Sequence, residues 1–472
     1  MVDNFQEYLI LIIICLFSLL CYSLFFKKPK DGFELPPSPP TLPIIKHLHL
    51  LLSGSTPKSL QKLSSREHEV NFSFRGTTPI DESLLVGSFG FFTAPYGDYW
   101  KFMKKVMVTK LLGPQALERS RVKNERVDIG KETMKFAKNI ICKMIMGRSC
   151  NEENGEAERV SDLVAESTAL TMKIFVANMF HKPLKKLGIS LFRKEIMSVS
   201  CRFDEVLERI LEEHENKKDD DQDMDLMDVL LETCRDETTA ECRITRNHIK
   251  SLFVDLVIAG SDTSRHATQW TMAEIINNPN VVERLREENG AVVGETRLVQ
   301  EKDLQNLPYL QATVKEGLRL HPPGALFARS SREGCKIRGF YIPVNTPLVV
   351  NAYAVMRDPD SWEDPNEFKP ERFLGSPRSG QEHEREHALK YIPFGSGRRG
   401  CPGSNLDCTI VGIAIGVMVQ CFDWKINSDK IDMEEAPRAL VLTMARPLMC
   451  IPVARTCRLQ VPDLEMSLNS QT

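Results

Sequence analysis

A cysteine lies at the end of a glycine-rich loop. The segment Phe394–Gly403 reads FGSGRRGCPG, with three glycines shortly before Cys401. Because glycine permits tight turns and close backbone approach, such a loop could hold its sulfur against a flat partner. Backbone N–H groups and the neighbouring Arg399 would stabilise a thiolate, and a lone cysteine ligand favours haem iron over zinc, which needs three further ligands nearby. The alternative is a glycine-rich loop with an incidental cysteine.

Three further segments combine residue types that could do chemistry. Glu316–Arg319 (EGLR) places opposite charges three residues apart, and Pro370–Phe373 (PERF) carries another charged pair. Ala259–Ser264 (AGSDTS) places a carboxyl and hydroxyls within a mostly apolar helical segment. Taken alone, each has an ordinary interpretation: a surface ion pair, a loop fragment and a solvated polar pair.

The order and spacing of these four segments resemble the cytochrome P-450 superfamily. The pattern F-x-x-G-x-R-x-C-x-G resembles its haem-binding loop, EGLR resembles the E-x-x-R of its K helix, and PERF resembles its segment of the same letters. AGSDTS resembles the oxygen-activation motif of its I helix. The resemblance extends from the N-terminal apolar segment to Thr456 and makes coincidence a poor explanation.

The resemblance implies haem b as cofactor, with Cys401 as the axial ligand of the iron. Thiolate ligation would favour cleavage of the O–O bond. Arg399 and Arg329 would bind the haem propionates, because guanidinium groups suit carboxylates. Lys104 replaces the arginine of the family's W-x-x-x-R, which keeps the charge but loses the bidentate geometry. The implied haem-binding residues are Trp100, Lys104, Arg329, Phe394, Arg399, Cys401 and Gly403.

Two further groups of residues receive roles from the resemblance. Glu316, Arg319 and Arg372 would form a buried triad that fixes the loop beneath the haem. Asp262 and Thr263 would be catalytic: Thr263 would support proton delivery to iron-bound peroxide, and Asp262 would gate the relay. In the family, a local distortion of this helix opens a groove for dioxygen and water.

The N-terminus predicts a membrane anchor. Tyr8–Phe26 is a run of nineteen residues without a charge, long enough to cross the roughly 30 Å hydrocarbon core as a helix. Lysines follow the run and acidic residues precede it, so the positive-inside rule places the remainder in the cytosol. A cleaved signal peptide is the alternative. We expect an anchor over residues 1–26, a basic, proline-rich hinge over 27–43, and a single-pass protein of the endoplasmic reticulum.

Composition limits the classes of function. The chain has 472 residues and a net charge of -3, which argues against nucleic-acid binding. Its thirteen cysteines are thinly spread and form no C-x-x-C pair, so a disulfide scaffold or a zinc ribbon is not predicted, and most thiols should be reduced.

Hydrophobic spacing predicts a mainly α fold with small β-sheets. Helices are expected over Ser200–Glu215, Leu226–Thr233 and Ile249–Asn277. Short β-rich pieces are expected from Gly334 to Asn351, namely CKI, GFYIP and TPLVVNAYAV. Cys408–Phe422 is apolar almost all round and short for a membrane span, which predicts a buried core helix. With the resemblance, we expect one helix-rich haem domain of cytochrome P-450 fold over residues 44–472.

Within the family, the chain resembles plant microsomal enzymes, specifically the subfamily of thalianol-type triterpenoid oxidases. This implies a membrane-anchored monooxygenase that uses O2, with electrons from NADPH through a reductase, to hydroxylate or desaturate an apolar secondary metabolite. Lys101, Lys105 and Arg398 could form a basic patch for the reductase. Candidate residues for the substrate pocket, which could equally be core, are Phe91, Phe92, Phe253, Val257, Ala325 and Phe327.

Two stretches are shorter than the family pattern. No strand hairpin is evident between Ser64 and Arg75, and Ser120–Glu132 replaces much of the D-helix region. The first loss would leave an uncovered edge on the main sheet. A shortened, non-catalytic haem-binding or scaffold paralogue is therefore an alternative to an active enzyme, and a membrane protein with a reactive cysteine is a further one.

Overall fold

The computed structural model describes the part of the chain that carries all four motifs. Its described residues are 126–146, 192–216, 225–235, 244–337, 340–374, 390–436 and 441–455, with Arg159, Leu163, Glu166, Ser167, Leu170 and Lys173. The expected anchor and hinge lie outside these residues. So do the predicted site residues Phe91, Phe92, Trp100 and Lys104.

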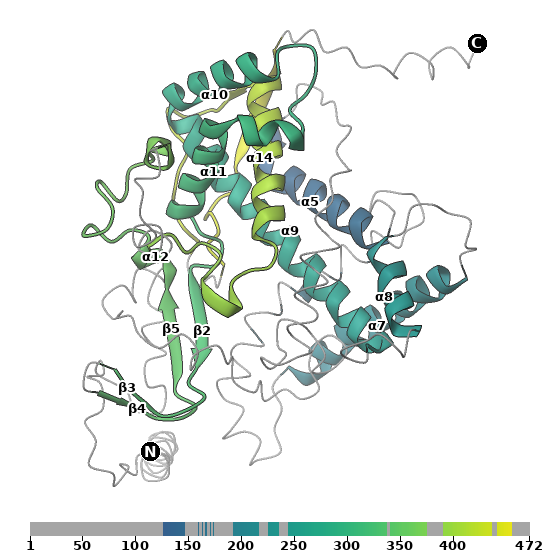
Figure 1. Cartoon of the computed structure of the whole chain (residues 1–472). Helices are drawn as coiled ribbons and strands as arrows, with labels where there is room; N and C mark the ends of the chain where they lie inside the picture. The colour runs from purple at the N-terminus through teal and green to yellow at the C-terminus, as the bar shows by residue number, and fades with distance from the viewer. Residues whose placement is uncertain are drawn as a thin grey trace, which may run out of the picture.

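Helices dominate the described part, and the longest of them connects its two halves. Figure 1 shows α9 running from α7 and α8 toward α11 and α14. The helices are α5 (Ile129–Met146), α7 (Arg193–Glu215), α8 (Leu226–Arg235), α9 (Arg246–Asn277), α10 (Pro279–Val292), α11 (Pro308–Leu320), α12 (Ala352–Val355) and α14 (Ser404–Cys421).

The first hydrophobic cluster joins α5, α7, α8 and the first half of α9. The α7 side chains that repeat at helical spacing are all buried, which confirms the helix predicted over Ser200–Glu215. They pack with apolar residues of α8 and with Phe253 and Val257 of α9. Lys250 of α9 is buried among them and its Nζ lies 2.6 Å from Asp204 Oδ1 of α7. This half of the fold holds the N-terminal half of α9 in place.

The second cluster joins the C-terminal half of α9 with α10, α11 and α14. Among the described residues, α14 is the one helix long and apolar enough to cross a membrane, and half of its apolar stretch is buried inside the protein. Val411, Ile415 and Val419 lie in this cluster together with residues of α9 and α11. The predicted core helix over Cys408–Phe422 is therefore confirmed.

Three small antiparallel sheets complete the described fold. β1 (Val127–Asp128) pairs with β7 (Met449–Ala454), which also pairs with β6 (Phe422–Lys425). β2 (Leu326–Ser330) pairs with β5 (Pro347–Asn351), and β3 (Cys335–Ile337) pairs with β4 (Phe340–Ile342). Among the described strands, none pairs with the other edge of β2, and the predicted loss of a hairpin between Ser64 and Arg75 lies outside these residues.

One strand prediction is wrong at its end. We expected the β-rich texture to continue through AYAV, but residues Ala352–Val355 form α12. The side chain of Asn351 accepts a hydrogen bond from the backbone N–H of Ala354 at 3.1 Å. Because an asparagine at this position satisfies a free N–H of a helical first turn, it ends β5 and starts a helix despite the β-forming residues that follow.

Candidate active site

Cys401 lies on an exposed turn that follows the short 3-10 helix η4 (Gly397–Arg399). Its backbone N–H donates to the carbonyl of Phe394 at 2.9 Å, which closes the loop on itself. Gly395 and Gly397 both have φ of +70°, a conformation that side chains with a Cβ rarely adopt. The glycines predicted to make a tight loop therefore do so, and they leave the sulfur accessible.

The loop lies against strand β2. A Cβ on Gly395 would come within 4.0 Å of the ring of Phe327 and of Arg329 Nη2. The one polar contact of Arg329 among the described residues is from Nη1 to the carbonyl of its neighbour Ala328, at 2.9 Å. Burial lowers the pKa of Arg329, so this cation is partly desolvated without a carboxylate partner.

These residues fit the haem that the family implies. One accessible sulfur is available for the iron, and Arg329 beside the loop suits the carboxylate of a propionate. Arg399 is buried on η4, directly before the cysteine turn. A Cβ on Gly403 would lie 3.9 Å from the sulfur, in ordinary van der Waals contact, so Gly403 lies directly beside the ligand atom. Phe394 is half-buried and packs against the second hydrophobic cluster.

Among the described cysteines, Cys201 on α7 is also exposed, but it lies on a helix and not on a glycine-rich loop. Burial raises the pKa of Cys408 and of Cys450 to about 12, so both are neutral and inert at ordinary pH. Cys142 is disulfide-bonded, and its partner lies outside the described residues. The described cysteines other than Cys142 are free, and they are Cys201, Cys234, Cys335, Cys401, Cys408, Cys421 and Cys450.

Asp262 is held within its own turn of α9. Its Oδ1 accepts hydrogen bonds from Arg265 Nε at 3.0 Å and Nη2 at 2.8 Å, and His266 Nε2 lies 3.5 Å away. Burial opposes ionisation, but the contacts with His266 and Arg265 outweigh it and lower the pKa of Asp262 to about 2. The carboxyl is therefore ionised and paired, not solvated.

Thr263 is half-buried, and its hydroxyl donates to the carbonyl of Ala259 at 2.5 Å, one turn back. This back-bonding was anticipated for a threonine in this helix. The expected distortion of the helix is not observed: α9 is an uninterrupted α-helix from Arg246 to Asn277. Around Thr263, the α9 backbone keeps its helical hydrogen bonds, and the feature that could bend the helix is the bond from the Thr263 hydroxyl to the Ala259 carbonyl.

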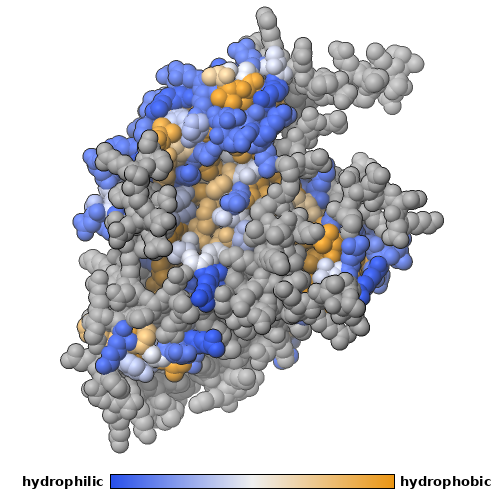
Figure 2. Space-filling model, viewed as in Figure 1, coloured by the Kyte–Doolittle hydropathy of each residue, from blue (hydrophilic) through white to orange (hydrophobic). Residues whose placement is uncertain are grey.

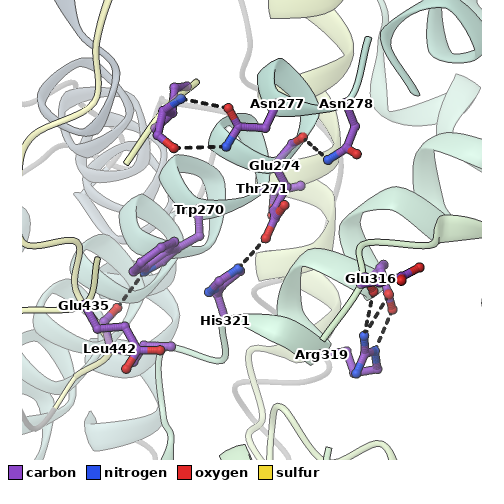
Figure 3. A network of polar contacts seen from close by, with 12 residues as sticks. Trp270, Thr271, Glu274, Asn277, Asn278, Glu316, Arg319, His321, Glu435 and Leu442 are labelled. Carbon is purple, nitrogen blue, oxygen red and sulfur yellow. Dashed lines mark hydrogen bonds and ion pairs between the residues drawn. The ribbon is translucent and has the colours of Figure 1, made fainter. Parts of the chain in front are cut away.

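Glu316 and Arg319 form a buried ion pair, so the surface reading of EGLR is wrong. Figure 3 shows the two side chains facing each other on α11. Both side chains are 0% exposed, and Arg319 Nε lies 2.7 Å from Glu316 Oε2. Glu316 Oε1 also accepts from Arg372 Nε at 3.2 Å, so the three residues predicted as a triad are brought together. Arg372 belongs to η3 (Pro370–Phe373), the PERF segment.

A second buried network was missed by the sequence analysis. His321, at the end of α11, bonds Glu274 of α9 through Nε2 at 2.7 Å and stacks on Trp270 with ring centroids 4.2 Å apart (Figure 3). Burial lowers the pKa of His321 more than Glu274 raises it, so the imidazole is neutral at ordinary pH. Trp270 Nε1 donates to the carbonyl of Leu442 at 3.0 Å. A polar residue in an apolar helix, such as Glu274, was the only available signal.

Some of the residues predicted to contact substrate lie in the hydrophobic core, and one lies beside the cysteine loop. Phe253 and Val257 are buried in the first hydrophobic cluster, and Ala325 is buried beside Trp270 and Tyr353. Phe327 is half-buried and lies next to the cysteine loop. Figure 2 shows apolar surface in the middle of the visible face, bordered by hydrophilic residues and by atoms drawn in grey. A depression among the described residues lies elsewhere, along the C-terminal end of α9, where Glu274, Asn277 and Asn278 line it.

A helix-rich fold with an accessible cysteine on a glycine loop and a buried Glu–Arg–Arg triad is the arrangement of haem-thiolate proteins. The family model of cytochrome P-450 matches residues 56–451. The chain therefore belongs to the cytochrome P-450 family. A zebrafish cytochrome P-450 solved with abiraterone shares the fold, with a TM-score of 0.64 and 22% identity over 82% of this chain and 89% of that chain.

Plant proteins are more similar. Cytochromes P-450 705A22 and 705A5 of Arabidopsis thaliana are both 56% identical over 96% of this chain, and the matches cover 97% and 98% of their lengths. A 3,9-dihydroxypterocarpan 6A-monooxygenase of Glycine max is 36% identical over 94% of this chain and 98% of its own. The chain is a cytochrome P-450 monooxygenase with a haem cofactor, similar to these plant enzymes.

The comparison also bears on chain length. The match to 705A22 spans 502 aligned positions, whereas the whole chain has 472 residues. At least 30 positions of that alignment therefore have no residue in this chain. This agrees with the expectation that stretches of the family pattern are shortened. Of the stretch Ser120–Glu132, the described part forms β1 and the first turn of α5.

Proposed function

We propose that this protein is a membrane-anchored monooxygenase that hydroxylates or desaturates an apolar plant metabolite, a triterpenoid, at a haem held by Cys401. The observation that carries the proposal is the accessible Cys401 sulfur on a closed glycine loop, beside the partly desolvated Arg329, which has no carboxylate partner among the described residues. When bound, the haem supplies the activation of O2. The residues of the chain bind it, orient the substrate and exclude water.

Each predicted haem contact has a distinct task in this proposal. Cys401 ligates the iron, and Arg329 and Arg399 neutralise propionates. Trp100 and Lys104, outside the described residues, add further contacts. The triad of Glu316, Arg319 and Arg372 contacts no cofactor in the proposal and keeps the chain beneath the loop in place.

Proton supply is assigned to α9. Thr263 would hold a proton at its hydroxyl for delivery to the haem site, and Asp262 would gate entry of protons from solvent. Because Asp262 is ionised and paired with Arg265, gating requires that pairing to loosen. The side chain of Asp262 then has to rotate away from its own helical turn.

The partners follow from the reaction. Electrons come from NADPH through a membrane-bound reductase, and the positive residues Lys101, Lys105 and Arg398 form its docking surface. The apolar N-terminal run over residues 1–26 anchors the enzyme in the endoplasmic reticulum membrane, with the haem domain in the cytosol. The triterpenoid class is supported by the resemblance to thalianol-type oxidases and by the apolar candidates for the pocket.

The absorption spectrum of the reduced, CO-bound protein tests the haem-thiolate proposal. We expect a red-shifted Soret band in the parent and in Cys408→Ser, whose thiol is buried and neutral. The band should be absent in Cys401→Ser. A folded parent protein without this band would instead support the shortened, non-catalytic alternative.

A substrate panel tests the finer proposal. Triterpenoids should give substrate-induced spectral shifts and NADPH-dependent products. A pterocarpan, the class that the Glycine max relative is named for, serves as the competing substrate. Turnover of the pterocarpan alone would overturn the triterpenoid assignment but leave the monooxygenase assignment intact.

A further inference from the structure

A carboxyl on α14 contacts the oxygen-activation segment of α9 from the side. Asp407 belongs to the first turn of α14, six residues after Cys401, and its backbone N–H donates to the carbonyl of Gly403 at 2.9 Å. Its Oδ1 is hydrogen-bonded to the hydroxyl of Ser264, which lies 143 residues earlier on α9. Ser264 immediately follows Asp262 and Thr263. The contact therefore joins the helix after the cysteine loop to the helix that carries both predicted catalytic residues.

The hydroxyl of Ser264 has two acceptors and one proton. Besides Asp407, Ser264 Oγ lies 2.8 Å from the carbonyl oxygen of Gly260. A serine hydroxyl donates one hydrogen bond at a time. When Asp407 is ionised, it can only accept, so it competes with Gly260 for that proton. When Asp407 is protonated, it can donate to Ser264 Oγ, and Ser264 is then free to donate to Gly260.

We propose that Asp407 is a pH-dependent positioning residue: its protonation decides, through the hydroxyl of Ser264, whether the Gly260 carbonyl of α9 keeps a second hydrogen bond. This rests on the proposed function, in which the same segment of α9 delivers protons. Serine bonds to the preceding turn tilt helix carbonyls and bend helices. The proton on Asp407 thus adjusts the turn Gly260–Ser264, and with it the position of the Thr263 hydroxyl.

The surroundings of Asp407 allow it to titrate near neutral pH. Burial raises its pKa to about 6, and the hydrogen bond from Ser264 opposes the rise. No cation among the described residues contributes to this shift. Where α5 meets the start of α14, Ala137 and Ile140 of α5 pack with Ile410.

Among the described residues, the other elements around α14 provide no second hydrogen-bond partner for the Asp407 side chain. The helix α11 carries Lys315 and Glu316 on this side, which act on Cys408 and on Tyr391 respectively. Burial raises the pKa of Cys408 and of Tyr391, the charge of Asp407 adds to both shifts, and both groups remain neutral. Contacts of α14 with α10 and with η2 (Glu301–Asn306) lie further along the helix, at Gly416 and Gly412. Ser264 is thus the polar partner of the Asp407 side chain among the described residues.

Infrared titration of the haem-loaded ferric protein tests the protonation. A C=O band of a protonated carboxyl that is present in the parent and absent in Asp407→Asn should titrate near pH 6. In Ser264→Ala its midpoint should move upward, because the hydrogen bond that favours ionisation is lost. The matched control is Asp360→Asn, which removes an exposed carboxyl on a loop. A missing band, or a midpoint near the ordinary aspartate value of about 4, would overturn the proposal.

The proposed effect of Asp407 on proton delivery is tested by the amount of product formed per NADPH consumed. In the parent, product formed per NADPH consumed should fall roughly twofold as pH rises through the Asp407 titration, because the second bond to Gly260 is lost. Asp407→Asn, whose amide can donate to Ser264, should keep the high ratio at all pH values. Ser264→Ala should keep the low ratio, and Asp360→Asn should follow the parent. A ratio that varies with pH equally in all four proteins would contradict the assignment.

The two proposals fail in different ways. If the CO-bound spectrum lacks the thiolate band while the infrared titration and its dependence on Ser264 persist, the proposed function is wrong and the Asp407–Ser264 link stands. If the band is present and the titration or its dependence on Ser264 is absent, this inference is wrong and the monooxygenase assignment stands.

Discussion

Arg319 donates two hydrogen bonds to the carboxylate of Glu316, from Nε to Oε2 at 2.7 Å and from Nη2 to Oε1 at 2.8 Å. The rest of the guanidinium is also occupied. Nη1 donates to the backbone carbonyls of Met356 at 2.7 Å and Pro365 at 2.8 Å. Nη2 also donates to the backbone carbonyl of Glu367 at 3.2 Å. All five N–H groups of an arginine therefore have acceptors.

Replacement of Arg319 should be severe even though the residue lies outside the reaction. Arg319→Ala leaves Glu316 as a buried charge and should cost about 3–5 kcal/mol of unfolding free energy. Arg319→Lys keeps the charge but has three donors for five acceptors, so it should also destabilise. Urea denaturation and haem content would measure both effects.

The control for this prediction is an arginine in an exposed pair. Arg284 lies beside Glu371, and both side chains are nearly half exposed. Because solvent screens such pairs, Arg284→Ala should cost less than about 1 kcal/mol. Equal losses for the two alanine variants would contradict the importance of burial.

Gly317 should not tolerate a larger residue. It lies within EGLR, and a Cβ on it would come within 2.1 Å of Thr271 Oγ1 on α9. Gly317→Ala should therefore force α11 away from α9 and cost about 1–3 kcal/mol, measured by thermal or urea unfolding. Addition of Thr271→Ala should recover part of the loss.

A glycine in open space provides the comparison. Gly290 lies inside α10, and a Cβ there would meet no atom within 4 Å. Gly290→Ala should stabilise the protein by roughly 0.5–1 kcal/mol through reduced backbone entropy. Destabilisation by both substitutions to the same extent would argue against the close approach at Gly317.

Loss of the Thr263 hydroxyl should uncouple the reaction. Thr263→Ala removes the group assigned to proton positioning, so peroxide released per electron should rise and product should fall. Peroxide and NADPH assays would measure the ratio, and Thr268→Ala, which loses a buried hydroxyl bonded to the Ser264 carbonyl, controls for helix packing. Unchanged coupling in Thr263→Ala would remove this residue from its role.

The pair of His214 and Asp225 predicts a pH-dependent stability. Burial lowers the pKa of His214, but hydrogen bonds with Asp225 (3.0 Å) and with the Ile210 carbonyl (2.8 Å) outweigh it and raise the pKa above its ordinary value. A raised histidine pKa contributes stability that is fully present below about pH 6.5 and is lost as pH rises through the folded-state value. His214→Gln should lack this component in melting temperatures compared across that range. An identical pH dependence in parent and variant would contradict the pairing.

The sequence predicted what local patterns encode. The amphipathic repeat of α7 and the apolar composition of α14 both identified helices, because each pattern reflects the neighbours that a single element buries. The cysteine loop was also predictable, since its glycines and its ligand are adjacent in the chain. The buried state of Glu316 and Arg319 required the family resemblance, because the spacing alone is also that of a surface pair.

Contacts between distant segments were not predictable. Nothing local indicates that Asp407 meets Ser264, or that Glu274 meets His321 and fixes it against Trp270. These pairs depend on how α9 crosses α11 and α14, which is set by packing of apolar residues over the whole second cluster. The helix α12 was missed for the opposite reason, because the capping bond of Asn351 overrides the preference of the residues that follow it.

The five hydrogen-bond donors of Arg319 should also make the unfolding of this region cooperative. Its acceptors belong to α11 and to chain segments near residues 356 and 365–367, so the set can be completed only after all of them have docked. Partly docked arrangements would contain a buried charge with missing partners and are therefore high in free energy. This region should open as one cooperative unit, with amide protons of α11 and of the segment to Glu367 exchanging together.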